Sequence, residues 1–221
     1  MNHSNPTRLL LTGFEPFGGS TLNPSQAAVE SIASGDQAFD HVQLHTALLP
    51  VDTQRIAARL DALWRESRPN IVIHLGESAK ASRMTLERVA LNLLDFDSPD
   101  NAGQRVVDQP IDPAGPAALF ATLPTRSLRD RLNEHGIEAD LSLSAGAYLC
   151  NQALYLSLAK ARRQGGAIVG FVHVPSLPEQ VNRGERKAPS MPLEQLIAEL
   201  RCLIGLTIDL YQEGAESRPS D

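Results

Sequence analysis

Short apolar runs alternate along the chain with longer segments whose apolar residues recur at helical spacing. The runs Arg8–Thr12, Ile71–Leu75 and Ala167–Val174 are almost wholly apolar, which is typical of interior strands of a parallel sheet. Further strands are predicted at Val42–Val51, Leu86–Leu94 and Ile137–Leu143, and helices at Asn23–Ala33, after Asp52, at Thr125–His135, after Ala147 and after Ser190. This alternation predicts one α/β domain over residues 1–221, a three-layer αβα sandwich with a mostly parallel central sheet. We expect flexible tails at about 1–7 and 215–221.

Three segments are predicted to be irregular because glycine, proline or polar residues dominate them. Residues 13–19 contain Phe14 and Phe17, which either plug the core or line an apolar pocket. The segment Asp95–Pro116 is a long loop, and loops of that length inside a domain are often functional. Residues 178–189 form the third, a polar loop.

Cys150 lies at a predicted junction between a strand and a helix. The strand Ile137–Leu143 leads into Gly146 and Ala147, and an apolar helix follows. Cys150 therefore falls within the first turn of that helix, where free backbone N–H groups and the helix dipole favour an anion. Such a position lowers the pKa of a thiol and increases its share of reactive thiolate. The alternative is a small buried core residue, the usual role of a lone cysteine.

Composition narrows the classes of protein that fit. The net charge of −6 argues against a nucleic-acid partner. Cys150 and Cys202 do not make a disulfide framework, so we expect a reducing compartment. The run at Arg8–Thr12 is too short for the core of a signal peptide, and no segment reaches membrane-spanning length. We therefore expect a cytoplasmic protein that binds neither nucleic acid nor membrane.

A thiol nucleophile needs a base, and the chain has six histidines. His3 lies near the start of the chain and His135 ends a helix, which leaves His41, His45, His74 and His173. Among these, His173 has the distinctive context, a strand end followed by a turn. A carboxylate can orient the imidazole of such a pair. Glu87 lies in an apolar strand beside Arg88, either as part of a surface ion pair or facing a cleft.

Six sequence blocks follow one another in a recognisable order. They are Leu11–Gly19 with Asn23–Ser25, Thr85–Asn92, Pro99–Asn101, Gly115–Pro124, Ser144–Asn151 and Gly170–Gln180. By these blocks the sequence resembles the pyroglutamyl peptidases, cysteine peptidase family C15, from Leu9 to about Leu200. The resemblance implies that Cys150 is the nucleophile, His173 its base and Glu87 the group that orients the imidazole.

The same resemblance implies an activity, a fold and an assembly. Members remove an N-terminal pyroglutamyl residue from peptides without metal or cofactor, have an αβα sandwich fold and commonly assemble as tetramers, so a tetramer or dimer is expected. The residues that it places against substrate are Phe14, Phe17, Asn23, Glu77 and Tyr148, with the aromatic side chains as walls for the lactam ring.

Two positions depart from the family pattern near the expected pocket. Many members have Gly-Gln-Ala-Gly-Gly-Arg where this chain has Gly76–Ala81, which places Glu77 in the position of a glutamine. Asp97 stands where an arginine is frequent. An ionised glutamate only accepts hydrogen bonds, so either a cation such as Lys80 or Arg83 neutralises it or its side chain points to solvent. Two other functions stay open: a related N-terminal amidase or peptidase of altered specificity, and a catalytically weak binding protein on the same scaffold.

Overall fold

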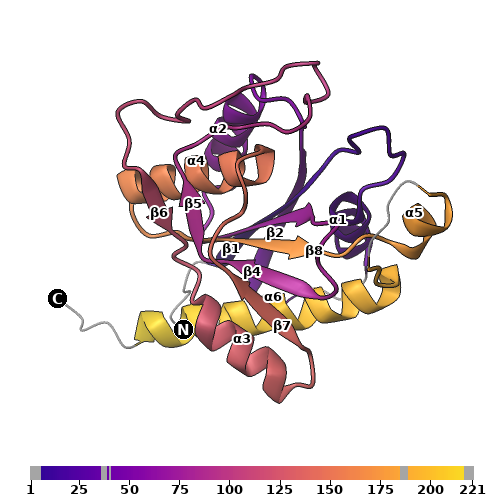
Figure 1. The fold of residues 1–221 in the computed structure, drawn as a ribbon. Helices are drawn as coiled ribbons and strands as arrows, with labels where there is room; N and C mark the ends of the chain where they lie inside the picture. Colours follow the sequence, from indigo (N-terminus) through magenta and orange to yellow (C-terminus); the bar gives the residue numbers. More distant parts are fainter. Residues whose placement is uncertain (1–5, 36–38, 40, 185–188, 217–221) are drawn as a thin grey trace.

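A six-stranded sheet forms the centre of the computed structural model, which describes residues 6–35, 39, 41–184 and 189–216 (Figure 1). Its strand order is β2-β1-β3-β8-β4-β7. The strands are β1 (Thr7–Phe14), β2 (Val42–Leu49), β3 (Ile71–Glu77), β4 (Met84–Glu87), β7 (Ala139–Ser142) and β8 (Ile168–Val174). All neighbouring pairs are parallel except β4 and β8, which are antiparallel. The mostly parallel sheet predicted from the sequence is confirmed.

Helices cover both faces of this sheet, which gives three layers (Figure 1). Helices α2 (Ile56–Ser67) and α4 (Leu149–Gln164) contribute to one hydrophobic core. Helices α1 (Pro24–Ser34), α3 (Thr125–Glu134) and α6 (Leu193–Glu216) contribute to the other. The predicted αβα sandwich is therefore confirmed.

The interior strands are apolar on both faces because a core lies on each side of the sheet. Leu9, Leu10 and Leu11 of β1 are all fully buried, and β3 is buried along its whole length. Leu10 faces the core beneath α4, whereas Leu9 and Leu11 face the core beneath α6. Two helical layers thus remove the alternation of polar and apolar residues that a one-sided sheet would show.

The single strand expected at Leu86–Leu94 is two strands in different sheets, so that prediction is wrong. The first part is β4, and after Arg88 the chain turns into β5 (Val89–Leu91). Strand β5 pairs antiparallel with β6 (Ala118–Phe120) and lies against α4. The break occurs because β4 belongs to the central layer whereas β5 lies above it, where the buried Asn151 side chain binds the β5 backbone.

Three smaller boundaries also differ from expectation. Strand β1 continues through Gly13 to Phe14, because Gly13 has no side chain to strike the carbonyl oxygen of Ser25, which lies 2.5 Å from a built Cβ position. The polar segment 178–189 contains a short helix, α5 (Pro178–Asn182). Ser190 pairs with Ser176 in an isolated bridge instead of capping α6.

The expected tails are only partly described. Strand β1 begins at Thr7 and α6 extends to Glu216. Residues 1–5 and 217–221 lie outside the described residues, as do 185–188 of the polar loop. Flexible tails therefore stay a prediction. Within the described ranges, no helix combines the length and apolar character needed to cross a membrane.

Candidate active site

Cys150 is the second residue of α4, and its thiol is partly exposed. The first intrahelical bond runs from the N–H of Gln152 to the carbonyl oxygen of Tyr148, so the N–H groups of Cys150 and Asn151 precede the helical ladder. Gly76, at the end of β3, allows the thiol to approach the sheet. A Cβ at Gly76 would lie 2.9 Å from the Sγ atom of Cys150, closer than ordinary contact. The predicted position of Cys150 in the first helical turn is confirmed.

His173 and Glu87 meet across the antiparallel pair of strands β8 and β4. Thr85 stands opposite His173 in the register, and Glu87 follows two residues later on the same face of β4. The His173 Nδ1 atom lies 2.7 Å from Glu87 Oε1, and both side chains are buried. Glu87 is therefore not part of a surface ion pair with Arg88.

The electrostatic environment of His173 favours its charged form. Burial on its own would lower the pKa of His173, but hydrogen bonds to Cys150 and Glu87 and the charges of both groups raise it to about 9. The imidazole is then protonated at neutral pH and stands beside both the thiol and the carboxylate. A thiol paired with an imidazolium is the activated state of a cysteine nucleophile.

The five residues predicted to bind substrate lie in one pocket beside the thiol. That pocket is lined by Phe14, Phe17, Asn23, Val51, Glu77, Tyr148, Leu149 and Cys150. Phe14 is buried, and the centroid of its ring lies 6.4 Å from that of Phe171, so it belongs to the core as well as to the pocket. Phe17 is only half-buried, and its ring faces that of Tyr148 at 6.3 Å. Val51 and Leu149 are pocket residues that sequence reasoning missed, since nothing in a local apolar pattern distinguishes a wall from a core.

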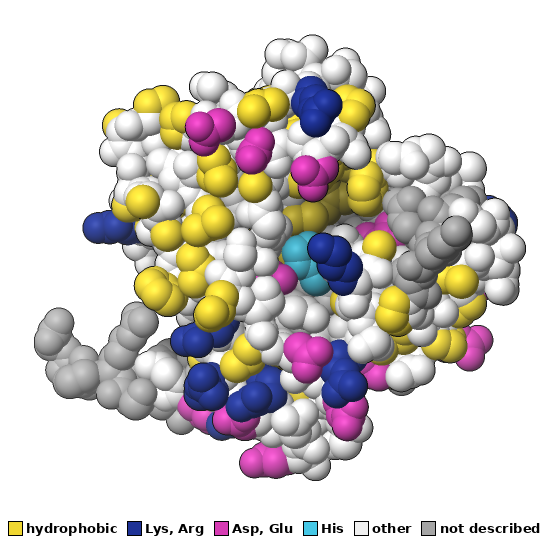
Figure 2. All heavy atoms as spheres, viewed as in Figure 1, with side chains coloured by type: hydrophobic (Ala, Val, Ile, Leu, Met, Phe, Trp, Pro, Cys, Tyr) yellow, Lys and Arg dark blue, Asp and Glu magenta, His cyan; other side chains and the backbone are white. Residues whose placement is uncertain are grey.

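A larger cavity of about 520 Å³ adjoins this pocket and shares Phe17, Glu77 and Tyr148 with it. Its remaining lining residues are Gly18, Ala79, Asp95, Asp97, Ser98, Pro99, Gly146 and Ala147. Figure 2 shows a hollow with a hydrophobic floor near the middle of the visible face and acidic side chains along its upper edge. The start of the long loop, including the unusual Asp97, thus belongs to the wall of the cleft.

Glu77 is buried, and two of its hydrogen-bond donors are neutral side chains. The Ser176 hydroxyl donates to Glu77 Oε1 at 2.7 Å, and the Gln180 side-chain amide lies 3.3 Å from both carboxylate oxygens. Of the two alternatives for Glu77, the one in which its side chain points to solvent is therefore excluded. Arg83 does not neutralise it either, because its guanidinium pairs with Glu138 at 2.6 Å.

Ser176 and Gln180 were not assigned a role from the sequence, although they stand in the same block as His173. Gln180 is fully buried and also reaches the loop before α1, through the Ser20 hydroxyl and the Leu22 carbonyl oxygen, each at 3.3 Å. One partner is local, because the Leu177 N–H donates to the Gln180 side-chain oxygen at 2.8 Å in a capping box at the start of α5. The other partners, Glu77, Ser20 and Leu22, lie more than 100 positions away and do not appear in any local pattern.

His74, one of the histidines that compete with His173, and the second cysteine, Cys202, have other environments. His74 lies in the core between the hydroxyl groups of Thr12 and Ser157, at 2.6 and 2.8 Å, and burial lowers its pKa to about 3. Cys202 is a partly buried residue of α6 that packs against the core, and burial raises the pKa of its thiol. Over the described part of the chain, no group of three or more His, Cys, Asp or Glu is placed to hold a metal ion.

A thiol at a helix N-terminus, with a buried imidazole and carboxylate in line behind it, defines a hydrolase of the cysteine-nucleophile class. The chain belongs to the pyroglutamyl peptidase family, peptidase C15, whose family model matches residues 7–209.

Relatives and solved structures agree with this assignment over nearly the full chain. The pyrrolidone-carboxylate peptidase of Chromobacterium violaceum is 39% identical over 203 residues, which covers 90% of this chain and 92% of that protein. The enzyme of the same name from Pseudomonas fluorescens is 41% identical over 196 residues, covering 89% and 90%. The pyrrolidone carboxyl peptidase structure from Thermococcus litoralis superposes with a TM-score of 0.87 at 34% identity, covering 94% of this chain and 96% of that one.

Proposed function

We propose that this protein removes an N-terminal pyroglutamyl residue from peptides, with Cys150 as nucleophile, His173 as acid and base, and Glu87 as the group that orients the imidazole. The observation that carries the proposal is the line of contacts from the Cys150 thiol through His173 to Glu87, beside a pocket with aromatic walls. Membership of the pyroglutamyl peptidase family supports it.

The reaction proceeds in two halves at these groups. The Cys150 thiolate attacks the carbonyl carbon that joins the pyroglutamyl residue to the peptide, and the backbone N–H groups of Cys150 and Asn151 face the developing oxyanion. His173 donates its proton to the leaving amine as the carbon–nitrogen bond breaks. Water then attacks the thioester with His173 as base, and free pyroglutamate leaves with the thiol restored.

The pocket residues divide into walls and supports. Phe14, Phe17 and Tyr148 supply apolar surface for the ring, and the Glu77 carboxylate accepts the lactam N–H. Asn23 supports the wall indirectly, because its side-chain oxygen accepts from the N–H of Ser25 at 3.0 Å and its amide donates to the carbonyl oxygen of Glu15 at 3.0 Å. It therefore fixes the loop that begins after Phe14 and carries Phe17.

A fluorogenic pyroglutamyl amide tests the proposal directly. Wild type and Cys202→Ala should turn the amide over, whereas Cys150→Ala should not, because only Cys150 is in contact with His173. Cys202→Ala is the matched control, since it removes the other thiol of the chain. Turnover that survives Cys150→Ala refutes the mechanism, and binding without turnover by wild type favours a binding protein on the same scaffold.

Altered specificity is the second candidate function, because Glu77 and Asp97 both line the cleft. An amidase of this kind would hydrolyse amides of other small N-terminal groups faster than the pyroglutamyl amide. A panel of such amides at equal concentration separates the two candidates.

We also propose that the protein is a cytoplasmic homo-oligomer, a tetramer or dimer. Val107, Phe120 and Leu143 are large hydrophobic residues that are 58%, 69% and 68% exposed, and Figure 2 shows hydrophobic side chains gathered over β5 and β6. Burial of such a patch between copies would lower its free energy. Two free cysteines support a reducing compartment. Light scattering should give a mass above one chain, and Phe120→Asp should lower it.

A further inference from the structure

The tripeptide Pro99–Asn101 contacts three segments that form walls of the substrate pocket. The Pro99 carbonyl oxygen accepts from the Tyr148 hydroxyl at 3.2 Å, which ties the tripeptide to the start of α4. The Asn101 side-chain amide donates to the carbonyl oxygen of Pro16 at 2.9 Å, beside Phe17. The Asn101 backbone N–H donates to the carbonyl oxygen of Val51 at 2.9 Å. Each contact therefore ends at a pocket residue or at its neighbour.

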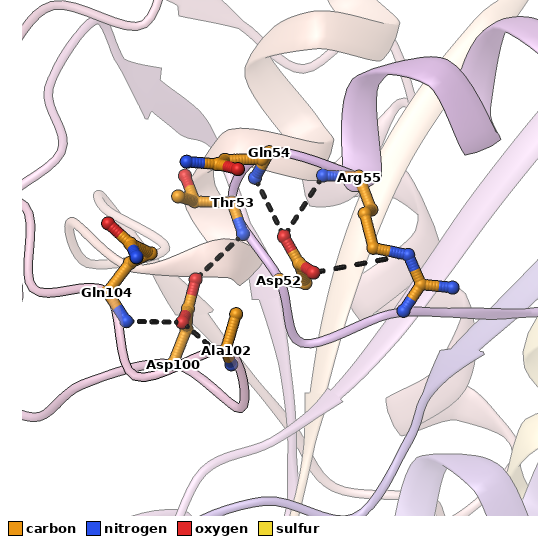
Figure 3. Close-up of polar contacts among 7 residues, drawn as sticks. All are labelled: Asp52, Thr53, Gln54, Arg55, Asp100, Ala102 and Gln104. Atoms are coloured by element: carbon orange, nitrogen blue, oxygen red, sulfur yellow. Dashed lines mark hydrogen bonds and ion pairs between the residues drawn. The ribbon is translucent and has the colours of Figure 1, made fainter.

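Asp100 supplies the strongest of these connections because its buried carboxylate accepts three backbone N–H groups (Figure 3). Oδ1 accepts from Ala102 at 3.0 Å and from Gln104 at 2.9 Å, which closes the turn of its own loop. Oδ2 accepts from Thr53 at 2.9 Å, across 47 positions of sequence. One oxygen thus shapes the loop and the other attaches it to the segment after β2.

The same chain of contacts continues to the helix that carries the nucleophile. The Thr53 hydroxyl donates to the Gln152 side-chain oxygen at 3.0 Å, and the Gln152 amide donates to the Thr53 carbonyl oxygen at 3.2 Å. Gln152 is buried two positions after Cys150. The loop wall is therefore connected to α4 through Asp100, Thr53 and Gln152.

The Tyr148 contact is suited to a permanent role. Burial, together with the charges of Asp100 and Cys150, raises the pKa of Tyr148 to about 12, so its hydroxyl stays protonated and continues to donate to Pro99. Phe96 packs against the same ring at 4.6 Å in an edge-to-face arrangement. Tyr148 is thus held by the loop on two sides.

We propose that Pro99–Asn101 is a clasp that holds the Phe17 and Tyr148 walls at the spacing that the lactam ring needs, with Asp100 and Asn101 as positioning residues. The inference rests on the proposed function, because it assigns the ring to the pocket beside Cys150. Neither residue reaches the reacting atoms. Loss of the clasp should therefore weaken binding of the ring and leave the chemical step largely intact.

Asp100→Asn tests the clasp because it changes one atom of the connection. The amide can keep its oxygen toward Ala102 and Gln104, but its NH2 group then meets the Thr53 N–H, so that two donors face each other. We expect KM for a pyroglutamyl amide to rise about tenfold while kcat stays within about threefold, the pattern of a loss of binding rather than of chemistry.

Asp52→Asn is the matched control and stands next to the clasp in Figure 3. Asp52 is also buried, and its Oδ1 accepts from the N–H groups of Gln54 at 2.9 Å and Arg55 at 3.1 Å. These contacts stay within its own turn, where asparagine is an equally good residue. We expect both kinetic constants to match wild type.

Hydrogen exchange gives a readout that does not require turnover. Asp100→Asn and Asn101→Ala should speed amide exchange in residues 14–18 as well as in 95–104, whereas Asp52→Asn should affect only 52–56. A wild type that fails to cleave the amide would refute the proposed function, and exchange alone would then decide on the clasp. The clasp is overturned if exchange in residues 14–18 is unchanged, or if Asp100→Asn lowers kcat without raising KM.

Discussion

Addition of a single methyl group at Gly76 should damage catalysis strongly. A Cβ built at Gly76 lies 2.9 Å from the Cys150 Sγ atom and 2.6 Å from the Cζ atom of Phe171. In Gly76→Ala the new methyl group would press on both atoms. The sulfur would then have to move away by about 0.5 Å to reach ordinary contact distance. The displaced Phe171 ring also touches His173, with ring centroids 4.8 Å apart, so the imidazole should move together with the sulfur.

A displacement of about 1 Å between reacting groups costs on the order of 100-fold in rate, so we expect kcat/KM of Gly76→Ala to fall between about tenfold and 100-fold. The assay is hydrolysis of a pyroglutamyl amide, with the rate of Cys150 alkylation by iodoacetamide measured in parallel. Gly205→Ala in α6 is the control, because among the described residues no atom beyond its chain neighbours and the nearby backbone of α6 would lie within 4 Å of the new methyl group. A Gly76→Ala enzyme with kcat/KM within threefold of wild type would refute the close approach of the thiol to β3.

Four further predictions concern the same pocket. Because the pKa of His173 is raised from 6.5 to about 9, the imidazolium is present below about pH 9 and lost above it, so kcat/KM should fall as pH rises through about 9. The stability linked to this raised pKa is fully present below pH 6.5 and should be lost progressively as pH rises from 6.5 to about 9. Phe17→Ala should raise KM, because apolar contact that contributes roughly 1–3 kcal/mol of binding free energy is lost, and the melting temperature should change little. Phe14→Ala should also lower the melting temperature clearly, since a buried Phe→Ala costs about 3–5 kcal/mol of stability. Glu77→Gln should change kcat/KM and its pH profile, and superimposable profiles would show that the carboxylate does not meet the substrate.

The central layers could be predicted from the sequence because local pattern determines them. An interior parallel strand buries both faces, so β1, β3 and β8 appear as apolar runs whatever their neighbours are. The strand–loop–helix junction at Cys150 was predictable for a similar reason. Gly146, with a φ of 83°, turns the chain, and the apolar helix begins three residues later.

The rest depends on contacts between distant segments. The run from Leu86 to Leu94 belongs to two sheets, and β5 is placed by distant segments: it pairs with β6, and the Asn151 side chain, 60 positions from Leu91, binds its backbone. The supports of the site follow the same rule. In the sequence, Asp100 looks like an ordinary loop residue, because its role depends on its contact with Thr53. Glu77 looks like an isolated charge, because the sequence does not show that Ser176 lies beside it.

The register of β3 with β8 places the residues beside the thiol next to an acidic residue of the substrate pocket. The parallel pairing sets Gly76 opposite His173, so the strand that makes room for the thiol lies directly beside the base. The next pair along is Glu77 opposite Val174, and two residues beyond Val174 the chain delivers the Ser176 hydroxyl to the Glu77 carboxylate at 2.7 Å. The buried acid of the pocket is therefore held by the segment that leaves the catalytic strand. Two hydrogen-bond donors to this glutamate, Ser176 and Gln180, come with the fold of the His173 block, so a change at Ser176 should alter substrate selection before it alters the nucleophile.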